Sequence, residues 1–205
     1  MTKKIYIPIL LFFVANLALA QRFDGGALAG FNASQVEGDI YKGYNKPGAV
    51  AGFYVETDIA PAIFAAMEIK FSQKGARKKV TTKDPEKNIM RLNYIDLPVY
   101  MAFRTSDKSS IIAGLSTGFL ISGKEFNIDG EFPPEDQNDF NTIDLQPLIG
   151  FQFDFLDNLK ADLRFAYSVL PIRAIYGVDG TTSYWQNNQF NNVITLALYY
   201  NIGRR

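Results

Sequence analysis

The chain has 205 residues with 21 basic and 21 acidic side chains, and it contains neither cysteine nor histidine. This balance gives no electrostatic footprint for nucleic acid, and the absence of cysteine excludes disulfides, thiol chemistry and cysteine zinc sites. The absence of histidine removes the commonest general base and the commonest transition-metal ligand. We therefore expect a non-enzymatic protein without a cofactor.

The first 20 residues have the organisation of a secretory signal peptide. Two lysines precede the apolar segment 5–19, which ends in the small-x-small pattern Ala18-Leu19-Ala20 that a signal peptidase accepts. A membrane anchor is the alternative, but the run is shorter than the ~20 apolar residues that span a bilayer. We expect cleavage between Ala20 and Gln21, which gives a signal peptide, 1–20, and a mature domain, 21–205.

Eight segments of alternating hydrophobicity follow, and most exceed the ~9–11 residues that a tilted membrane strand needs. In chain order, they are Gly25–Ser34, Gly48–Ile59, Ile63–Lys74, Leu92–Arg104, Ser110–Lys124, Ile143–Phe155, Leu159–Val169 and Val193–Ile202. An even number of antiparallel strands is what closure of an outer-membrane barrel requires. The sequence therefore predicts an all-β fold, an eight-stranded antiparallel transmembrane up-and-down β-barrel behind a cleaved signal peptide.

The period of two is clearest in the segment Leu159–Val169. Its odd positions are all apolar, whereas its even positions include Lys160, Asp162 and Arg164. Such a strand lies between two different media. We expect the apolar face to contact lipid and the charged face to line the lumen.

Connections between these segments alternate in length. Short connections lie at 60–62, 105–109 and 156–158, and long polar connections lie at 35–47, 75–91, 125–141 and 170–190. Short periplasmic turns and long external loops are the pattern of outer-membrane barrels. We therefore expect an outer-membrane location, with both termini in the periplasm and the long loops outside the cell.

Two of the short turns predict the register of their hairpins, because directly opposed residues face the same side. Three-residue turns at 60–62 and 156–158 predict the following opposed pairs: Asp58 with Phe64, Tyr54 with Glu68, Phe155 with Leu159, Asp154 with Lys160, and Gly150 with Arg164. The register predicts that Asp154 and Lys160 form an ion pair.

The predicted inward face carries seven acids and six bases. They are Glu56, Asp58, Glu68, Lys70, Lys74, Asp96, Arg104, Lys124, Asp144, Asp154, Lys160, Asp162 and Arg164. A path for ions or solutes is one interpretation of this set. A plug of paired charges is favoured, since side chains can fill an eight-stranded barrel and buried charges must be paired. Paired carboxylates could also imitate a catalytic site, but regular alternation explains them.

The long loops carry three clusters for which a binding role is the alternative to an ordinary exposed loop. The basic stretch Lys74, Arg77, Lys78, Lys79, Lys83 and Lys87 would contact lipopolysaccharide phosphates. The acidic residues Asp129, Glu131, Glu135, Asp136 and Asp139 would bind Ca²⁺, although their spacing matches no EF-hand loop. The aromatic residues Tyr176, Tyr184, Trp185 and Phe190 would stack on a glycan or form a girdle at the lipid–water boundary.

Several motifs resemble PorT-like outer-membrane β-barrel proteins of Bacteroidetes. Residues 68–77, EIKFSQKGAR, resemble the family's E-L-x-Y-S-Q-K-G segment, and residues 92–100, LNYIDLPVY, resemble its L-N-Y-L-E-I-P-L-L strand. Residues 29–34, AGFNAS, and 46–48, KPG, are similar to its opening strand and the start of its second strand. One departure is the C-terminus, YNIGRR, where family chains often end on an aromatic residue.

The resemblance spans nearly all of the mature chain and implies a bacterial outer-membrane barrel without catalytic residues. It also implies a link to protein secretion, because the founding member is tied to the type IX system. We expect a monomeric barrel that contacts outer-membrane lipid, lipopolysaccharide and unnamed envelope proteins in a structural or interaction role. A narrow channel for small solutes or ions is the alternative.

Overall fold

The computed structural model describes residues 23–39, 43–80, 88–133, 139–174 and 184–202. The predicted signal peptide and its cleavage site lie outside these residues. The strands of the described part are β1 (Phe23–Glu37), β2 (Lys46–Ala60), β3 (Ile63–Arg77), β4 (Ile89–Ser106), β5 (Ser109–Phe126), β6 (Ile143–Leu156), β7 (Leu159–Tyr167), β8 (Arg173–Ala174) and β9 (Asn188–Asn201). Within the same residues no helix is long and apolar enough to cross a membrane.

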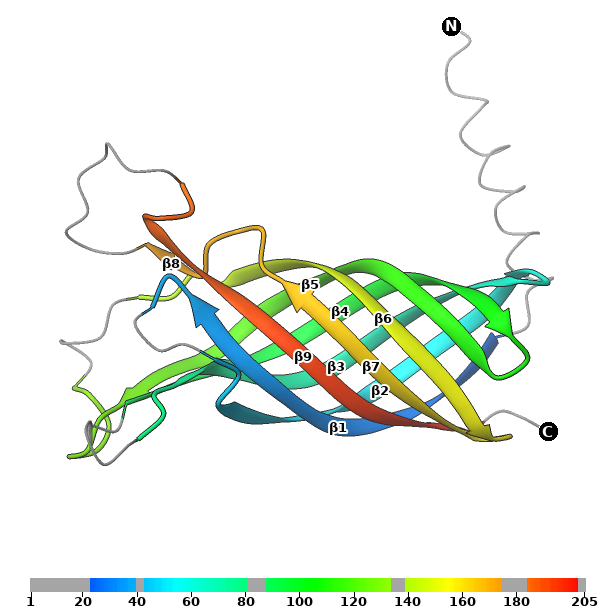
Figure 1. Cartoon of the computed structure of the whole chain (residues 1–205), viewed down its shortest axis with the longest axis horizontal. Coiled ribbons are helices and arrows are strands. Elements are labelled where there is room, and N and C mark those ends of the chain that lie inside the picture. The colour runs from blue at the N-terminus through cyan, green and yellow to red at the C-terminus, as the bar shows by residue number, and fades with distance from the viewer. Residues whose placement is uncertain (1–22, 40–42, 81–87, 134–138, 175–183, 203–205) are drawn as a thin grey trace, which may run out of the picture.

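Eight of these strands form a closed antiparallel barrel (Figure 1). Each strand from β1 to β7 pairs with its neighbour in sequence, β7 pairs with β9, and β9 pairs with β1 to close the barrel. The short β8 pairs only with β9, next to the long connections. The predicted all-β, eight-stranded barrel is thus confirmed.

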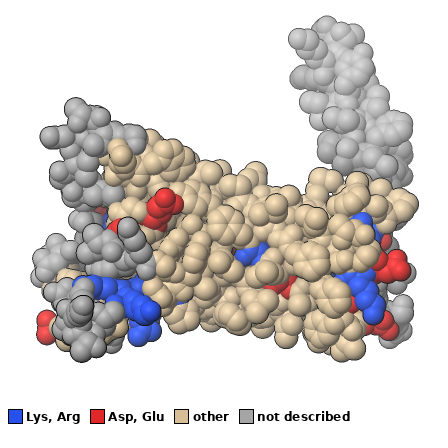
Figure 2. All heavy atoms as spheres, viewed as in Figure 1, with Lys and Arg blue, Asp and Glu red and all other residues tan. Residues whose placement is uncertain are grey.

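The outward face is apolar and the inward face is polar. On β7, Leu163 and Phe165 are 52% and 41% exposed, whereas the intervening Arg164 is 3% exposed. Figure 2 shows the result as a broad belt, almost free of charge, between two charged ends. A soluble protein buries its apolar residues and exposes its charges, so this reversed arrangement fits a barrel surrounded by lipid.

The predicted registers hold along both hairpins but not at their tips. Asp58 opposes Phe64, Tyr54 opposes Glu68, Asp154 opposes Lys160, and Gly150 opposes Arg164. At the tips, however, Ala60 opposes Ile63 and Leu156 opposes Leu159, so Phe155 is not the partner of Leu159. The predicted three-residue turns are two-residue turns, each preceded by a bulge, at Ile59 in β2 and at Phe155 in β6, that absorbs the extra residue.

A bulge in β5 changes the direction of the strand's last side chains. Tyr94 on β4 opposes Leu120, but Asn93 opposes Ser122, which leaves Ile121 as the extra residue. One extra residue exchanges inward and outward positions beyond it. Lys124 therefore points outward with a side chain 48% exposed, and the prediction that it lines the lumen was wrong.

Candidate functional site in the barrel lumen

The centre of the lumen is occupied by Arg164, which bridges two carboxylates. Its Nη1 and Nη2 donate to the two carboxylate oxygens of Glu68 at 3.2 and 3.0 Å, and Nη2 also donates to Asp162 Oδ2 at 2.9 Å. The Arg164 side chain is 2% exposed and both carboxylates are 0% exposed. Glu68 lies on β3 and Arg164 on β7, so this contact joins strands that are not neighbours in the barrel.

Further inward side chains complete the central cluster. Lys70 Nζ lies 3.2 Å from Glu68 Oε2, and the Tyr199 hydroxyl donates to Glu68 Oε1 at 2.7 Å. Gln152 Nε2 donates to Asp162 Oδ2 at 2.9 Å. Two cations thus face two carboxylates, so the cluster is electrically neutral. Buried charges persist in this form, paired and hydrogen-bonded.

A second cluster surrounds Lys74, nearer the long connections. Its Nζ lies 3.0 Å from Asp96, 3.4 Å from Asp144 and 2.9 Å from Gln146 Oε1. Asp144 also accepts hydrogen bonds from Ser168 Oγ at 2.6 Å and from the side-chain Nδ2 of Asn191 at 2.9 Å. Lys74 is 1% exposed. It therefore belongs to the lumen and not to the external basic stretch in which the sequence also placed it.

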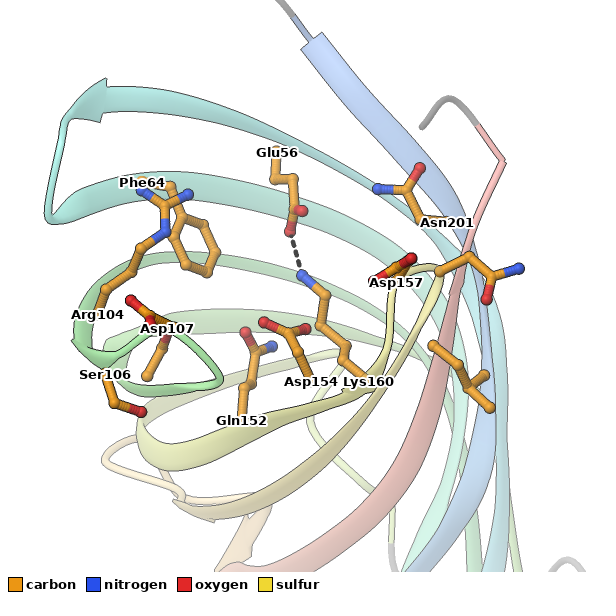
Figure 3. Close-up of a pocket in the computed structure, with 13 residues that line it drawn as sticks. Glu56, Phe64, Arg104, Ser106, Asp107, Gln152, Asp154, Asp157, Lys160 and Asn201 are labelled. Carbon is orange, nitrogen blue, oxygen red and sulfur yellow. Dashed lines mark hydrogen bonds and ion pairs between the residues drawn. The ribbon is translucent and has the colours of Figure 1, made fainter. Parts of the chain in front are cut away.

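The short-turn end of the lumen holds a polar cavity of about 80 Å³ (Figure 3). Lys160 Nζ reaches across it to Glu56 Oε2 at 2.7 Å. Asp154 also lines the cavity, yet no ion pair joins it to Lys160 in the described part of the chain. The predicted Asp154–Lys160 ion pair was wrong. The two backbones are opposed, but the lysine side chain crosses the lumen to another carboxylate.

The rim of this cavity carries the remaining predicted pair, of which Arg104 also lines the cavity. Arg104 on β4 and Asp58 on β2 form an ion pair, with side chains 37% and 70% exposed. Arg104 also stacks over the Phe64 ring, 4.9 Å from its centroid. These two residues sit in solvent at the end of the barrel, so they are not part of the buried interior that the sequence predicted.

Apart from Lys124, the sequence-predicted lumen charges fall into four groups along the barrel. The groups are Asp58 with Arg104; Glu56, Asp154 and Lys160; Glu68, Lys70, Asp162 and Arg164; and Asp96 and Asp144 with Lys74. Sequence reasoning missed the uncharged members, which include Tyr100, Gln146, Gln152, Ser168, Asn191 and Tyr199. Most of them lie at alternate strand positions that face inward, and this alternation is the signal from which they could have been predicted.

One further buried ion pair lies at the long-connection end. Arg173 donates to both carboxylate oxygens of Glu125, at 2.9 and 3.1 Å, and to Gln189 Oε1 at 2.9 Å. Its guanidinium also lies 4.4 Å from the Phe140 ring centroid. Arg173 comes from the long connection after β7, where no periodic pattern could have predicted its direction.

The loop clusters are only partly described. Lys83, Lys87, Glu135, Asp136 and Tyr176 lie outside the described residues. Phe190 stacks on the outward-facing Tyr167 with centroids 6.2 Å apart, and Trp185 lies 4.6 Å from Phe190. Phe190 itself is 1% exposed, so the members of this group whose exposure fits a girdle are Tyr184 and Trp185, at 48% and 52%.

The lumen clusters act as braces. Each buried lysine or arginine named above contacts at least one carboxylate, and the contacts of Lys74 with Asp144, Lys160 with Glu56 and Arg164 with Glu68 join strands that are not neighbours. Within the described residues, no three potential ligands among histidine, cysteine, aspartate and glutamate are placed to hold a metal ion. The geometry therefore fills and stiffens the barrel.

Comparisons with known proteins agree with this architecture. Among solved structures, the chain is similar to Ail, the attachment invasion locus protein of Yersinia pestis, with 15% identity, a TM-score of 0.50, and coverage of 87% of this chain and 98% of that chain. It is also similar to Neisserial surface protein A, with 14% identity, a TM-score of 0.47, and coverage of 87% and 96%. No curated protein matches the chain. The family described as outer membrane protein beta-barrel domain matches residues 16–173, and the chain belongs to this family.

Proposed function

We propose that the protein is a non-enzymatic outer-membrane barrel with a closed lumen, which serves a structural or interaction role in the envelope. The observation that carries this proposal is the central cluster, in which Arg164 joins Glu68 across the lumen without exposure to solvent. An eight-stranded barrel is narrow enough for side chains to fill it. A filled lumen leaves the loops, the turns and the lipid-facing surface as the places for contact.

The proposed orientation places the short turns and both termini in the periplasm. In support, β1 begins and β9 ends at the short-turn end of the barrel (Figure 1). Outer-membrane barrels share this arrangement of short periplasmic turns and long external loops. The proposed signal peptide, 1–20, would deliver the mature domain, 21–205, to the envelope.

The proposed partners are outer-membrane lipid, lipopolysaccharide and envelope proteins, contacted by a single barrel. The PorT-like motifs of β3 and β4 support a link to protein secretion in a Bacteroidetes cell. A photo-crosslinking amino acid at Asp107 in a short turn, and another at the exposed Trp185, tests this in intact cells. A secretion component captured from either position, but not from the lipid-facing control Leu163, supports the link, and capture of lipid alone at all three positions contradicts it.

A narrow channel is the second candidate, and the cavity beside Lys160 is the observation that favours it. Gln152 lines this cavity and also binds Asp162 of the central cluster, so the cluster forms its floor. We therefore expect purified protein to give no stable conductance in planar bilayers. Resolvable single-channel steps from the wild-type protein would contradict the closed lumen and support the channel.

A further inference from the structure

At the long-connection end, the outward face of β3–β5 changes abruptly from apolar to polar. Phe71 and Ile95 form the last apolar rung, and Gln73 and Asn93 form the next one. Gln73 Nε2 donates to Asn93 Oδ1 at 3.0 Å, and Asn93 Nδ2 donates to Ser122 Oγ at 2.9 Å. This polar ladder marks the level at which the surface no longer fits lipid chains.

Three exposed cations lie beyond the ladder, and together they are called the outer basic strip: Arg77, Arg91 and Lys124. Arg91 lies directly opposite Lys124 on the neighbouring strand. Arg77 lies two residues beyond Gly75, which is the partner of Arg91 on β3. Lys46 lies behind the strip: it is only 4% exposed, and its Nζ donates to Gln73 Oε1 at 3.4 Å. Figure 2 shows basic side chains gathered at this end of the barrel, over the ends of β3–β5.

Among the described residues, the strip has more positive charge than the neighbouring carboxylates neutralise. Lys124 pairs with Glu131 at 2.9 Å, and Arg91 lies over the Phe126 ring at 5.0 Å. Among the described residues, no carboxylate forms an ion pair with Arg77 or Arg91, although both are exposed. The lumen cations differ in this respect, since each has a carboxylate partner. Like charges opposed on neighbouring strands destabilise a sheet, so an anion between Arg91 and Lys124 would relieve a repulsion.

We propose that the outer basic strip binds the phosphate groups of lipopolysaccharide in the outer leaflet. Arginine and lysine bind phosphate through charge-assisted hydrogen bonds, and the arginine fork does so with two donors. The strip is continuous with the apolar belt through Phe71 and Ile95, so its ligand must carry phosphate directly above hydrocarbon chains. Lipopolysaccharide has this chemistry in the outer leaflet. This assignment rests on the proposed orientation, in which the long connections lie outside the cell.

The bulge in β5 supports the same interpretation. If Ile121 occupied a regular ladder position instead of forming the bulge, Lys124 would point into the lumen and Gly123 would point outward. Bulges commonly redirect a side chain at the rim of a barrel. Here the bulge adds a cation to the face that meets the lipid headgroups.

The test measures binding of diphosphoryl lipid A to the purified, folded barrel in detergent. We expect the variant Arg77→Gln/Arg91→Gln to bind about tenfold more weakly or worse, because two charge-assisted contacts are lost. Lys108→Gln, a matched change in a short turn at the opposite end, is expected to bind as the wild type does. Dephosphorylated lipid A and phosphatidylglycerol are the competing ligands.

Three outcomes would overturn the assignment: equal binding by the double variant, equal binding of dephosphorylated lipid A, or equally tight binding of phosphatidylglycerol. The last would mean that the strip accepts any lipid phosphate. Folding of each variant is checked independently by its shift in electrophoretic mobility on heating. The proposed function is tested separately, by membrane fractionation and by conductance measurements on the wild type. If the wild-type barrel is found in the outer membrane but does not bind lipid A, only the assignment of the strip is contradicted.

Discussion

Replacing Arg164 with methionine tests whether the lumen charges brace the barrel. Arg164 makes three hydrogen bonds to the carboxylates of Glu68 and Asp162, and all three side chains are almost fully buried. In the variant, Glu68 keeps Lys70 at 3.2 Å, but Asp162 keeps no cation among the partners described. Leaving a buried charge without its partner costs ~3–5 kcal/mol. We expect the free energy of unfolding to fall by this amount.

A double-mutant cycle then separates pairing from the general cost of substitution. The variants are Arg164→Met, Glu68→Gln and the double variant, each unfolded in urea with lipid vesicles present. We expect the double variant to lose ~1–3 kcal/mol less than the sum of the single losses, as for residues in one buried network. The reason is that the double substitution removes one positive and one negative charge together, so the lumen stays neutral.

The rim pair Arg104–Asp58 provides the control, because it also joins an arginine to a carboxylate but lies in solvent. Its side chains are 37% and 70% exposed, and exposed ion pairs couple by only ~0.2–1 kcal/mol. Losses in the central cycle that add within ~0.3–0.5 kcal/mol would refute the reasoning. So would equal coupling energies at the centre and at the rim.

Two further predictions follow from the same geometry, and a third follows from the sequence of the first 20 residues. The losses in free energy of unfolding caused by Lys160→Met and Glu56→Gln should be non-additive, whereas those of Lys160→Met and Asp154→Asn should add. Urea cycles in which Lys160 couples to Asp154 and not to Glu56 would contradict the Lys160–Glu56 ion pair. Leu163→Arg should lower the free energy of unfolding by ~2–4 kcal/mol because it places a charge at mid-bilayer, whereas Leu163→Phe should be nearly neutral; equal losses would count against a lipid-facing position. Protein purified from outer membranes should begin at Gln21, and N-terminal sequencing that returned Met1 would show that the signal peptide is retained.

The strands and their facing could be predicted because lipid and a polar lumen impose opposite demands on alternate residues. In β7, every second residue from Leu159 is apolar and the others are mainly polar, and the structure turns these two sets to opposite sides. The same alternation restricted the register of the hairpins. Directly opposed residues face the same side, so only every second register places the inward-facing Asp154 opposite an inward-facing residue such as Lys160. The two-residue period of hydrophobicity and the lengths of the connections therefore predict most of the fold.

The partners within the lumen could not be predicted from this pattern. Parity states which side a residue faces, but it does not state its height in the barrel or which strands lie across from it. Lys160 illustrates the difference, because its long side chain passes its backbone neighbour Asp154 and reaches Glu56 from a distant part of the sequence. Exposure at the rim was equally hidden, since Arg104 and Asp58 continue the inward pattern beyond the point where the lumen is closed to solvent.

The β5 bulge shows why the loop end was harder to predict than the centre. In residues 119–124 the apolar and polar residues give no clear alternation, because Ser122 and Gly123 are small enough for either face. The bulge is visible only in the pairing with β4, where Asn93 binds Ser122 and Arg91 opposes Lys124. Regular alternation placed Lys124 with the lumen charges, where it would have needed a buried carboxylate. The bulge places it beside Arg91 instead, so a single extra residue moves a cation from the lumen to the outer basic strip.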